Sequence, residues 1–178
     1  KKTKLSPSDL SAVAISEGPG SYTCLRIGVS AAKGICFPLN IPLIALDTMH
    51  ILARKIECSE GYIVPAIDAR RDEIYFAMFQ STNCKIPELK VKTDTMILSS
   101  DSFSNYYETS TVNFVGDCNK KIMQYLNHEN IFFSDYILPS ANEMGILSHS
   151  KYVKEQFVNV AEFQPKYLKD FGAKKINN

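Results

Sequence analysis

The stretch Ser16–Leu39, SEGPGSYTCLRIGVSAAKGICFPL, decides the fold of this chain. An apolar run at 12–15 leads into a loop of turn-forming residues, Gly18-Pro19-Gly20-Ser21. Its glycines supply backbone freedom and its proline fixes one φ angle, and a nearly uncharged segment with helical spacing follows. The stretch therefore predicts a strand, a tight loop and a long helix, with Ser21 or Thr23 as the N-cap.

The predicted helix has two apolar faces. The face that suits packing on a sheet carries Leu25, Val29, Ala32, Cys36 and Leu39. The opposite face is a stripe of small and apolar residues, Ile27, Ser30, Ala31, Gly34 and Phe37. An ordinary surface helix carries more charge on its outer side. Either the chain itself covers this second face, or a partner protein does.

The start of this helix has two further readings. A helix start after a glycine-rich loop can bind an anion through its free N–H groups, although most such starts bind only their own cap. Cys24, in the first turn, could be a thiol with a lowered pKa. Its neighbours Thr23 and Leu25 favour the other reading, a small core residue.

Composition limits the class of protein. The chain has 178 residues, 45% of them hydrophobic, and its 20 basic and 19 acidic side chains leave a formal charge of +1. Such a chain can bury a core but has no global basic field for nucleic acid. Five dispersed cysteines indicate reduced thiols in a cytoplasmic protein. We find no pattern of a signal peptide or a membrane span.

The order of patterns predicts an α/β protein with two lobes. Strands at 12–16 and 41–46 flank the long helix as a βαβ unit, and a helix at 49–57, capped by Asp47 or Thr48, completes residues 1–60. Residues 61–178 form a second α/β lobe that begins with a hairpin, 63–67 and 73–80. Further strands are expected at 88–93, 112–116 and 131–133, and helices at 101–108, capped by Ser99 or Ser100, 117–126 and 141–156.

Few residues suggest catalysis. The three histidines are far apart and lack the spacing of a metal site, and no serine lies in a nucleophile elbow. The densest charge cluster is the hairpin turn, with Asp68, Arg70, Arg71, Asp72 and Glu73. This turn could be a salt-bridged turn, an acid/base site, an anion clamp or a partner contact. The residues alone identify no enzyme and no metal ligand.

Four linked motifs resemble the bacterial TsaB (YeaZ) family. They are GPGSYTCLRIG at 18–28, AKG at 32–34, IDARRDEIY at 67–75 and PKYL at 165–168. Their order and spacing agree with the family over nearly the whole chain. The resemblance implies an actin/Hsp70-like (ASKHA) two-lobe fold and a paralogue of TsaD that lacks the metal-binding histidine pair of TsaD.

The resemblance also implies a function. TsaB-like proteins are non-catalytic subunits in the synthesis of N6-threonylcarbamoyladenosine at position 37 of tRNA. TsaD transfers the threonylcarbamoyl group, the ATPase TsaE joins the assembly, and tRNA reaches TsaB only through the complex. ATP, ADP and metal are therefore expected on the partner subunits, with no cofactor on this chain. An isolated TsaB-like chain is expected to form a homodimer through the face that it offers to TsaD.

The family's partner-facing helix maps onto the helix after the Gly18–Ser21 loop. Its expected interface residues are Tyr22, Thr23, Arg26, Ile27, Ser30, Ala31, Gly34 and Phe37. Two positions depart from the family, which has Phe where Tyr22 stands and Gly where Cys24 stands. The family's opening strands and first helix are also absent, so the first lobe is expected to be incomplete. The alternative is an actin-like enzyme, either an ATP-dependent phosphotransferase or a glycoprotease-type hydrolase.

Overall fold

The first unit of the fold is a parallel pair of strands joined by a long helix. A computed structural model describes residues 4–57, 60–81 and 86–169. Strand β1 (Val13–Gly18) pairs in parallel with β2 (Leu43–Asp47), and α1 (Tyr22–Leu39) connects them. The 3₁₀ helix η1 (Pro7–Asp9) precedes β1. The predicted βαβ unit is therefore confirmed.

The second unit is a mixed sheet of five strands in the order β5-β4-β3-β6-β7. Its strands are β3 (Tyr62–Asp68), β4 (Glu73–Gln80), β5 (Glu88–Ile97), β6 (Val112–Gly116) and β7 (Ile131–Phe133). The predicted hairpin is the antiparallel pair β3 and β4. β4 lies between β3 and β5, and both of its faces are buried because Met78 packs in one hydrophobic core and Phe79 in another.

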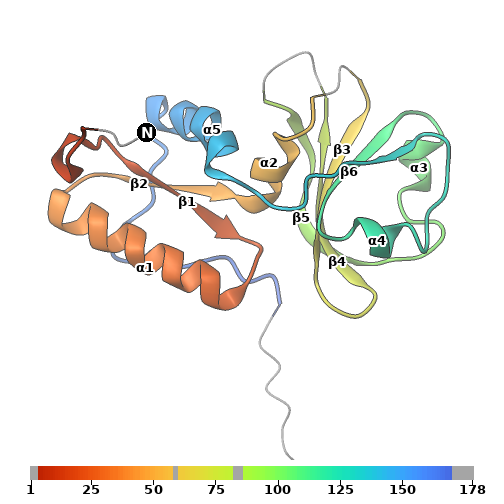
Figure 1. Cartoon of the computed structure of the whole chain (residues 1–178), viewed down its shortest axis with the longest axis horizontal. Coiled ribbons are helices and arrows are strands. Elements are labelled where there is room, and N and C mark those ends of the chain that lie inside the picture. The colour runs from red at the N-terminus through yellow and green to blue at the C-terminus, as the bar shows by residue number, and fades with distance from the viewer. Residues whose placement is uncertain (1–3, 58–59, 82–85, 170–178) are drawn as a thin grey trace, which may run out of the picture.

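The short helix α2 (Thr48–Ala53) lies between the two sheets. Met49 and Leu52 on α2 pack with Ile63, Phe79 and Val115 of the five-stranded sheet. The opposite face of that sheet is covered by α3 (Ser104–Tyr107) and α4 (Asn119–Ile122) (Figure 1). One face of the five-stranded sheet thus packs against α2 between the two units, and the other face forms a separate hydrophobic core with α3 and α4.

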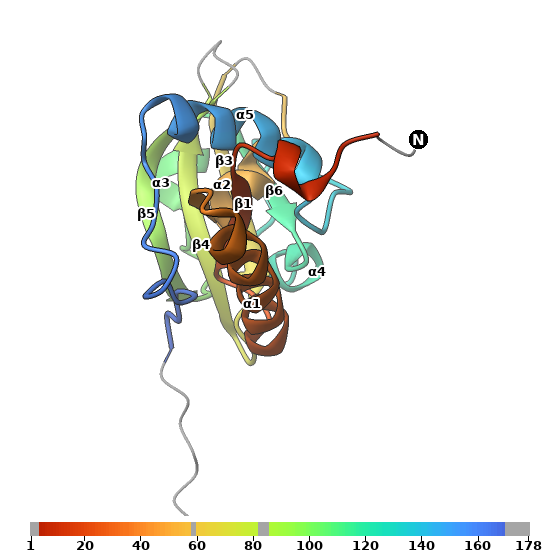
Figure 2. The same cartoon turned by 90° about the vertical axis from the view of Figure 1, so that its left-hand side faces the viewer.

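The end of the described chain returns to the first unit. Helix α5 (Ala141–Val153) lies on the face of β1 and β2 opposite α1, as Figures 1 and 2 show. Lys151 of α5 donates to the backbone oxygen of Ala45 at 2.6 Å, and Val158 forms an antiparallel bridge with Leu43. The division of the chain into two lobes at residue 60 stays a prediction. The structure adds that residues 141–168, from the predicted second lobe, pack against the first unit.

Several predicted boundaries were wrong. Strand β5 runs to Ile97, and α2, α3, α4 and α5 are shorter than predicted. After Ile122 the backbone hydrogen bonds mix two spacings, since Gln124 donates three residues back and Leu126 four residues back, and regular α4 ends there. Neither Ser99 nor Ser100 caps α3, because Phe103 is the N-cap. The backbone N–H of Ser99 instead donates to the hydroxyl oxygen of Ser102.

Candidate functional site

Helix α1 presents the two faces that its sequence predicts. Val29, Ala32 and Cys36 are buried against the two-stranded sheet. The opposite stripe is exposed along its whole length, at Ile27, Ser30, Ala31, Gly34 and Phe37. Ile27 is 65% exposed and Phe37 75% exposed, so no described part of the chain covers these large apolar side chains. Of the two alternatives left open by the sequence, the structure excludes burial by the described chain.

Gly34 and Cys24 are two small residues of α1 whose surroundings bear on the predicted site. A Cβ added to Gly34 would have no atom within 4 Å, so the space above this glycine is open. The prediction that Cys24 is a small core residue was wrong, because its side chain is exposed in the first turn of the helix. Cys24 lies three positions before Ile27 and seven before Ala31, so the helical period places it on the exposed side of α1. We name the exposed stripe Ile27, Ser30, Ala31, Gly34 and Phe37 the α1 face.

The loop before α1 is shaped by a close approach of backbone. Gly18 has φ +114° and is joined to Pro19 by a cis peptide bond. A Cβ on Gly18 would lie 2.8 Å from the backbone oxygen of Lys166. Glycine is therefore required here for both its conformation and its lack of a side chain. Ser21 is the N-cap, as predicted, but its side chain makes no capping hydrogen bond.

The residues that approach Gly18 form an irregular segment, 164–169, which we name the strap. Its Lys166 donates its backbone N–H to Glu17 O at 2.7 Å and pairs its ammonium with the Glu17 carboxylate at 2.5 Å. Tyr167 accepts a hydrogen bond from Arg26 Nε at 3.1 Å, and its ring lies 5.0 Å from that of Tyr22. The strap thus brings the PKYL motif against the first turn of α1.

The charged hairpin turn is paired through residues distant in sequence. Asp68 forms an ion pair with Lys121, and Glu73 forms one with Lys169 of the strap. The hydrogen bond from Lys121 is the main reason that the pKa of Asp68 lies below its ordinary value. Arg70 and Arg71 have φ of 69° and 53°, and neither guanidinium is among the ion pairs of the described residues. Lysines from α4 and the strap, which sequence spacing could not supply, pair with two of the carboxylates of this turn.

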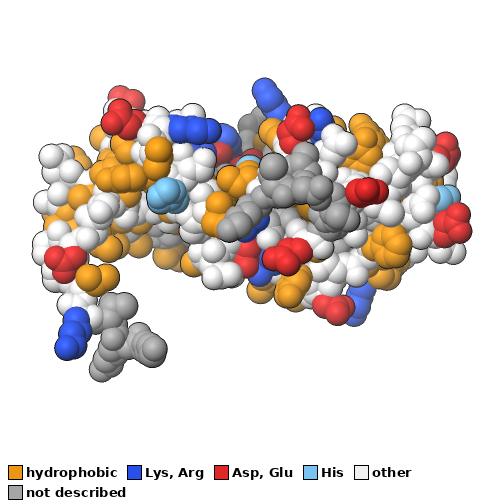
Figure 3. Space-filling model, turned by 90° about the horizontal axis from the view of Figure 1, so that it is seen from above, with side chains coloured by type: hydrophobic (Ala, Val, Ile, Leu, Met, Phe, Trp, Pro, Cys, Tyr) orange, Lys and Arg blue, Asp and Glu red, His pale blue; other side chains and the backbone are white. Residues whose placement is uncertain are grey.

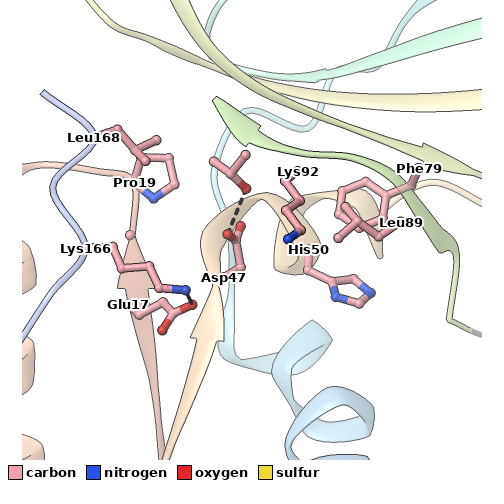
Figure 4. Close-up of a pocket in the computed structure, with 11 residues that line it drawn as sticks. Glu17, Pro19, Asp47, His50, Phe79, Leu89, Lys92, Lys166 and Leu168 are labelled. Atoms are coloured by element: carbon pink, nitrogen blue, oxygen red, sulfur yellow. Dashed lines mark hydrogen bonds and ion pairs between the residues drawn. The ribbon is translucent and has the colours of Figure 1, made fainter. Parts of the chain in front are cut away.

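Two cavities meet at the strap. A cleft of about 610 Å³ is lined by the α1 start, the hairpin turn and the strap, including Ser21, Arg70 and Tyr167. A smaller cavity of about 390 Å³ lies between the two sheets, beneath Pro19 and Leu168 (Figure 4). The structure therefore brings together the Gly18–Ser21 loop, the turn at 68–70 and the strap, three of the four motifs that resemble TsaB.

The smaller cavity is lined by polar side chains from several elements. Asp47 caps α2 by accepting from the Met49 N–H at 2.7 Å, and its second oxygen accepts from the Thr93 hydroxyl at 2.8 Å (Figure 4). Asp47 was one of the two predicted caps. His50 packs on Phe79, with ring centroids 4.9 Å apart. Burial, together with the nearby charges of Lys151 and Arg54, lowers the pKa of His50 to about 4, so this imidazole is neutral at pH 7.

The described residues contain no group of three or more His, Cys, Asp or Glu side chains arranged to hold a metal ion. None of the helices in the described ranges is long and apolar enough to span a membrane. The face seen from above α5 carries acidic and basic side chains in mixture, with no field of one sign (Figure 3).

Comparisons with known proteins agree with the motifs. The family model described as "TsaD: tRNA N6-adenosine threonylcarbamoyltransferase" matches residues 1–176. The protein "tRNA threonylcarbamoyladenosine biosynthesis protein TsaB" of Bacillus subtilis (strain 168) is 36% identical over 93 residues, which are 52% of this chain and 41% of that protein. Its namesake from Haemophilus influenzae is 26% identical over 174 residues, 89% of this chain and 70% of that protein.

The chain belongs to the TsaB (YeaZ) family. The match to the TsaD model fits the relationship of TsaB to TsaD as paralogues. The solved structure "YeaZ from Pseudomonas aeruginosa" superposes with a TM-score of 0.78 at 22% identity, covering 92% of this chain and 76% of that one. This likeness supports the α/β fold. The match spans less than half of the Bacillus subtilis TsaB, so the activity and partners of the whole protein are proposals.

Proposed function

We propose that this TsaB-family chain is a non-catalytic subunit of a complex that makes N6-threonylcarbamoyladenosine in tRNA, and that it binds a TsaD homologue. The relatives named as threonylcarbamoyladenosine biosynthesis proteins support the pathway. The scaffold role is supported by the exposed α1 face, which is the single observation that carries the proposal. A surface helix with large uncovered apolar side chains is typical of a protein interface.

The α1 face suits close packing against another helix. Ser30, Ala31 and Gly34 are small and lie between the bulkier Ile27 and Phe37. Small side chains allow two helices to approach closely, and large ones beside them fill grooves on the partner. Tyr22, Thr23 and Arg26 extend this surface to the start of the helix, next to the strap. The turn residues Asp68, Arg70, Arg71 and Glu73 are proposed as a charged contact at its border.

The remaining parts of the assembly follow from this role. We infer that TsaE joins the complex, that tRNA is contacted through it, and that the chain forms a homodimer when isolated. ATP, ADP and metal are assigned to the partner subunits, and the complex to the cytoplasm. An ASKHA two-lobe arrangement remains our proposal for the fold, with the two sheets on either side of α2 as its support.

Co-purification with a TsaD homologue tests the docking proposal. Ile27→Glu or Gly34→Glu places a carboxylate on the α1 face, where neither position is packed against the described chain, and should abolish the association. Val153→Glu is the matched control, because Val153 is 67% exposed on α5 and should leave binding intact. Unchanged binding of the folded Ile27→Glu protein would refute the interface, and ATP hydrolysis by the isolated chain would refute the non-catalytic role.

A further inference from the structure

The strap contacts both units of the fold. Toward the first unit, Lys166 binds Glu17 and Tyr167 binds Arg26. Toward the second unit, the Lys169 ammonium donates to Ala69 O at 3.0 Å and pairs with Glu73. Since residues 164–169 have no regular hydrogen-bonded structure of their own, these contacts determine the position of the strap.

The strap also divides the space between the two units. Lys166 and Leu168 line both the cavity of about 390 Å³ and the cleft of about 610 Å³, and Pro19 is the third residue shared by both. Figure 4 shows Lys166 and Leu168 on one side of the smaller cavity, opposite the residues of β5. Removing the strap from Gly18 would join the two spaces into one cleft.

The strap is held by polar contacts and by partial burial of its apolar side chains. Lys166 is exposed, and Tyr167 and Leu168 remain 38% and 39% exposed, so the strap buries its apolar surface only in part. The Lys166 side chain is 61% exposed, whereas that of Glu17 is 10% exposed, so salt reaches and screens this ion pair from the lysine side. Segments with few buried apolar contacts open locally, at a free energy far below that of global unfolding.

We propose that residues 164–169 are a strap that opens while the rest of the chain stays folded, joining the two cavities and releasing Arg26 at the start of α1. The opening itself is independent of any partner. Its consequence for α1 rests on the proposed function, because Tyr167 orders Arg26 at the border of the proposed docking surface. Binding at α1 and closure of the strap are then coupled in both directions.

Native-state hydrogen exchange of the full chain tests the opening. The reporter is the Lys166 N–H, which is hydrogen-bonded to Glu17 O, and the reference is the set of β2 amides. We expect the Lys166 amide to exchange about 100-fold faster or more than the slowest β2 amides, through local opening. Its rate should rise further as salt is increased from low concentration to about 1 M.

A pair of variants identifies the restraint. Lys166→Met keeps the reporter amide but removes the ammonium, and should speed its exchange about two- to fivefold and cancel most of the salt effect. Lys90→Met is the control, because it removes the exposed pair of Lys90 with Glu88 at 3.0 Å on β5 and should change neither. A Lys166 amide that exchanges only as slowly as β2 would overturn the proposal. So would local opening that responds to neither salt nor Lys166→Met.

The partner-dependent consequence has a separate readout. If a TsaD homologue binds at α1, exchange at Lys166 should slow in the complex relative to the free chain. Binding without any change at Lys166 would overturn the coupling but not the docking. Opening in the free chain with no binding at all would overturn the proposed function and leave the strap proposal standing.

Discussion

Arg26 donates a hydrogen bond from Nε to the hydroxyl of Tyr167 at 3.1 Å, although 141 positions separate the two residues in sequence. The guanidinium also lies 4.1 Å from the centroid of the Tyr22 ring. A side chain held in this way is ordered before any partner arrives, which lowers the entropic cost of docking. The strap thereby takes part in shaping the start of α1.

Tyr167→Phe removes the acceptor for Arg26 and keeps the ring that packs on Tyr22. We expect the affinity for a TsaD homologue to fall about two- to tenfold, the range of one hydrogen bond, with an unchanged melting temperature. Titration calorimetry of the variant and the parent chain measures this. Tyr152→Phe, on the opposite side of the two-stranded sheet, should leave affinity unchanged, and equal affinities for Tyr167→Phe and the parent chain would contradict the ordering role of Tyr167.

Gly34→Ala separates stability from docking. Alanine should stabilise the chain by about 0.5–1 kcal/mol, because glycine in a helix interior has a larger loss of backbone entropy and no described atom obstructs the new methyl group. The same methyl group should keep a partner helix from close contact and weaken docking.

Gly145→Ala on α5 is the control for this experiment. Gly145 is also a helical glycine with no atom within 4 Å of an added Cβ. Gly145→Ala should give the same stabilisation as Gly34→Ala in urea unfolding and should not change docking. Equal docking by both variants would argue against helix packing at Gly34.

Asp47 connects the end of β2 with β5, and its removal should be costly. Asp47→Ala loses both the cap on Met49 and the hydrogen bond from Thr93, so we expect about 2 kcal/mol less stability. Thr93→Val breaks only the second bond and should cost about half as much. Urea unfolding of the two single variants and the double variant gives the coupling between Asp47 and Thr93. The double variant should lose no more stability than Asp47→Ala alone, and additive losses would contradict a stabilising bond between the two residues.

The lowered pKa of His50 predicts that the chain loses stability in mild acid. Its pKa is about 4 in the folded chain and about 6.5 when unfolded. The unfolded state therefore binds a proton on His50 more readily than the folded state does. The contribution of neutral His50 to stability is complete above pH 6.5 and is lost as the pH falls through 4. The loss reaches at most about 3 kcal/mol.

Unfolding free energies at several pH values between 7 and 4 check the role of His50. His50→Phe should flatten the curve in this window, since phenylalanine can pack on Phe79 without titrating. His149→Phe, on the exposed side of α5, should keep the slope of the parent chain. An unchanged slope for His50→Phe would assign the acid sensitivity to other groups.

The sequence predicted the local units well because their signals are local. The periodicity of α1, the alternation in β4 and the Asp47 cap each depend on residues within a few positions. The partners of Asp68 and Glu73 could not be predicted, because Lys121 and Lys169 reach them from α4 and the strap. Cys24 was misplaced for another reason, because its immediate neighbours were considered and not its helical spacing to the exposed Ile27 and Ala31.

The position of the strap was not predicted, although its PKYL motif is one of the four that resemble TsaB. The PKYL residues have no periodic pattern, and their meaning lies in the close approach of Lys166 O to Gly18. Sequence reasoning explained Gly18 by turn geometry alone. That position 18 must also lack a side chain becomes visible only when the segment packed against Gly18 is known.

The return of α5 and residues 157–168 to the two-stranded sheet has a consequence for how the protein is made. Residues 62–133 contain all strands of the larger sheet in one continuous stretch, so this unit can fold while the ribosome is still adding residues. β1 and β2 precede this stretch, yet Leu43 meets Val158 only after the whole of it has been synthesised. β2 therefore waits for this native neighbour until the larger sheet is complete, and during that interval it is a segment that a chaperone would protect.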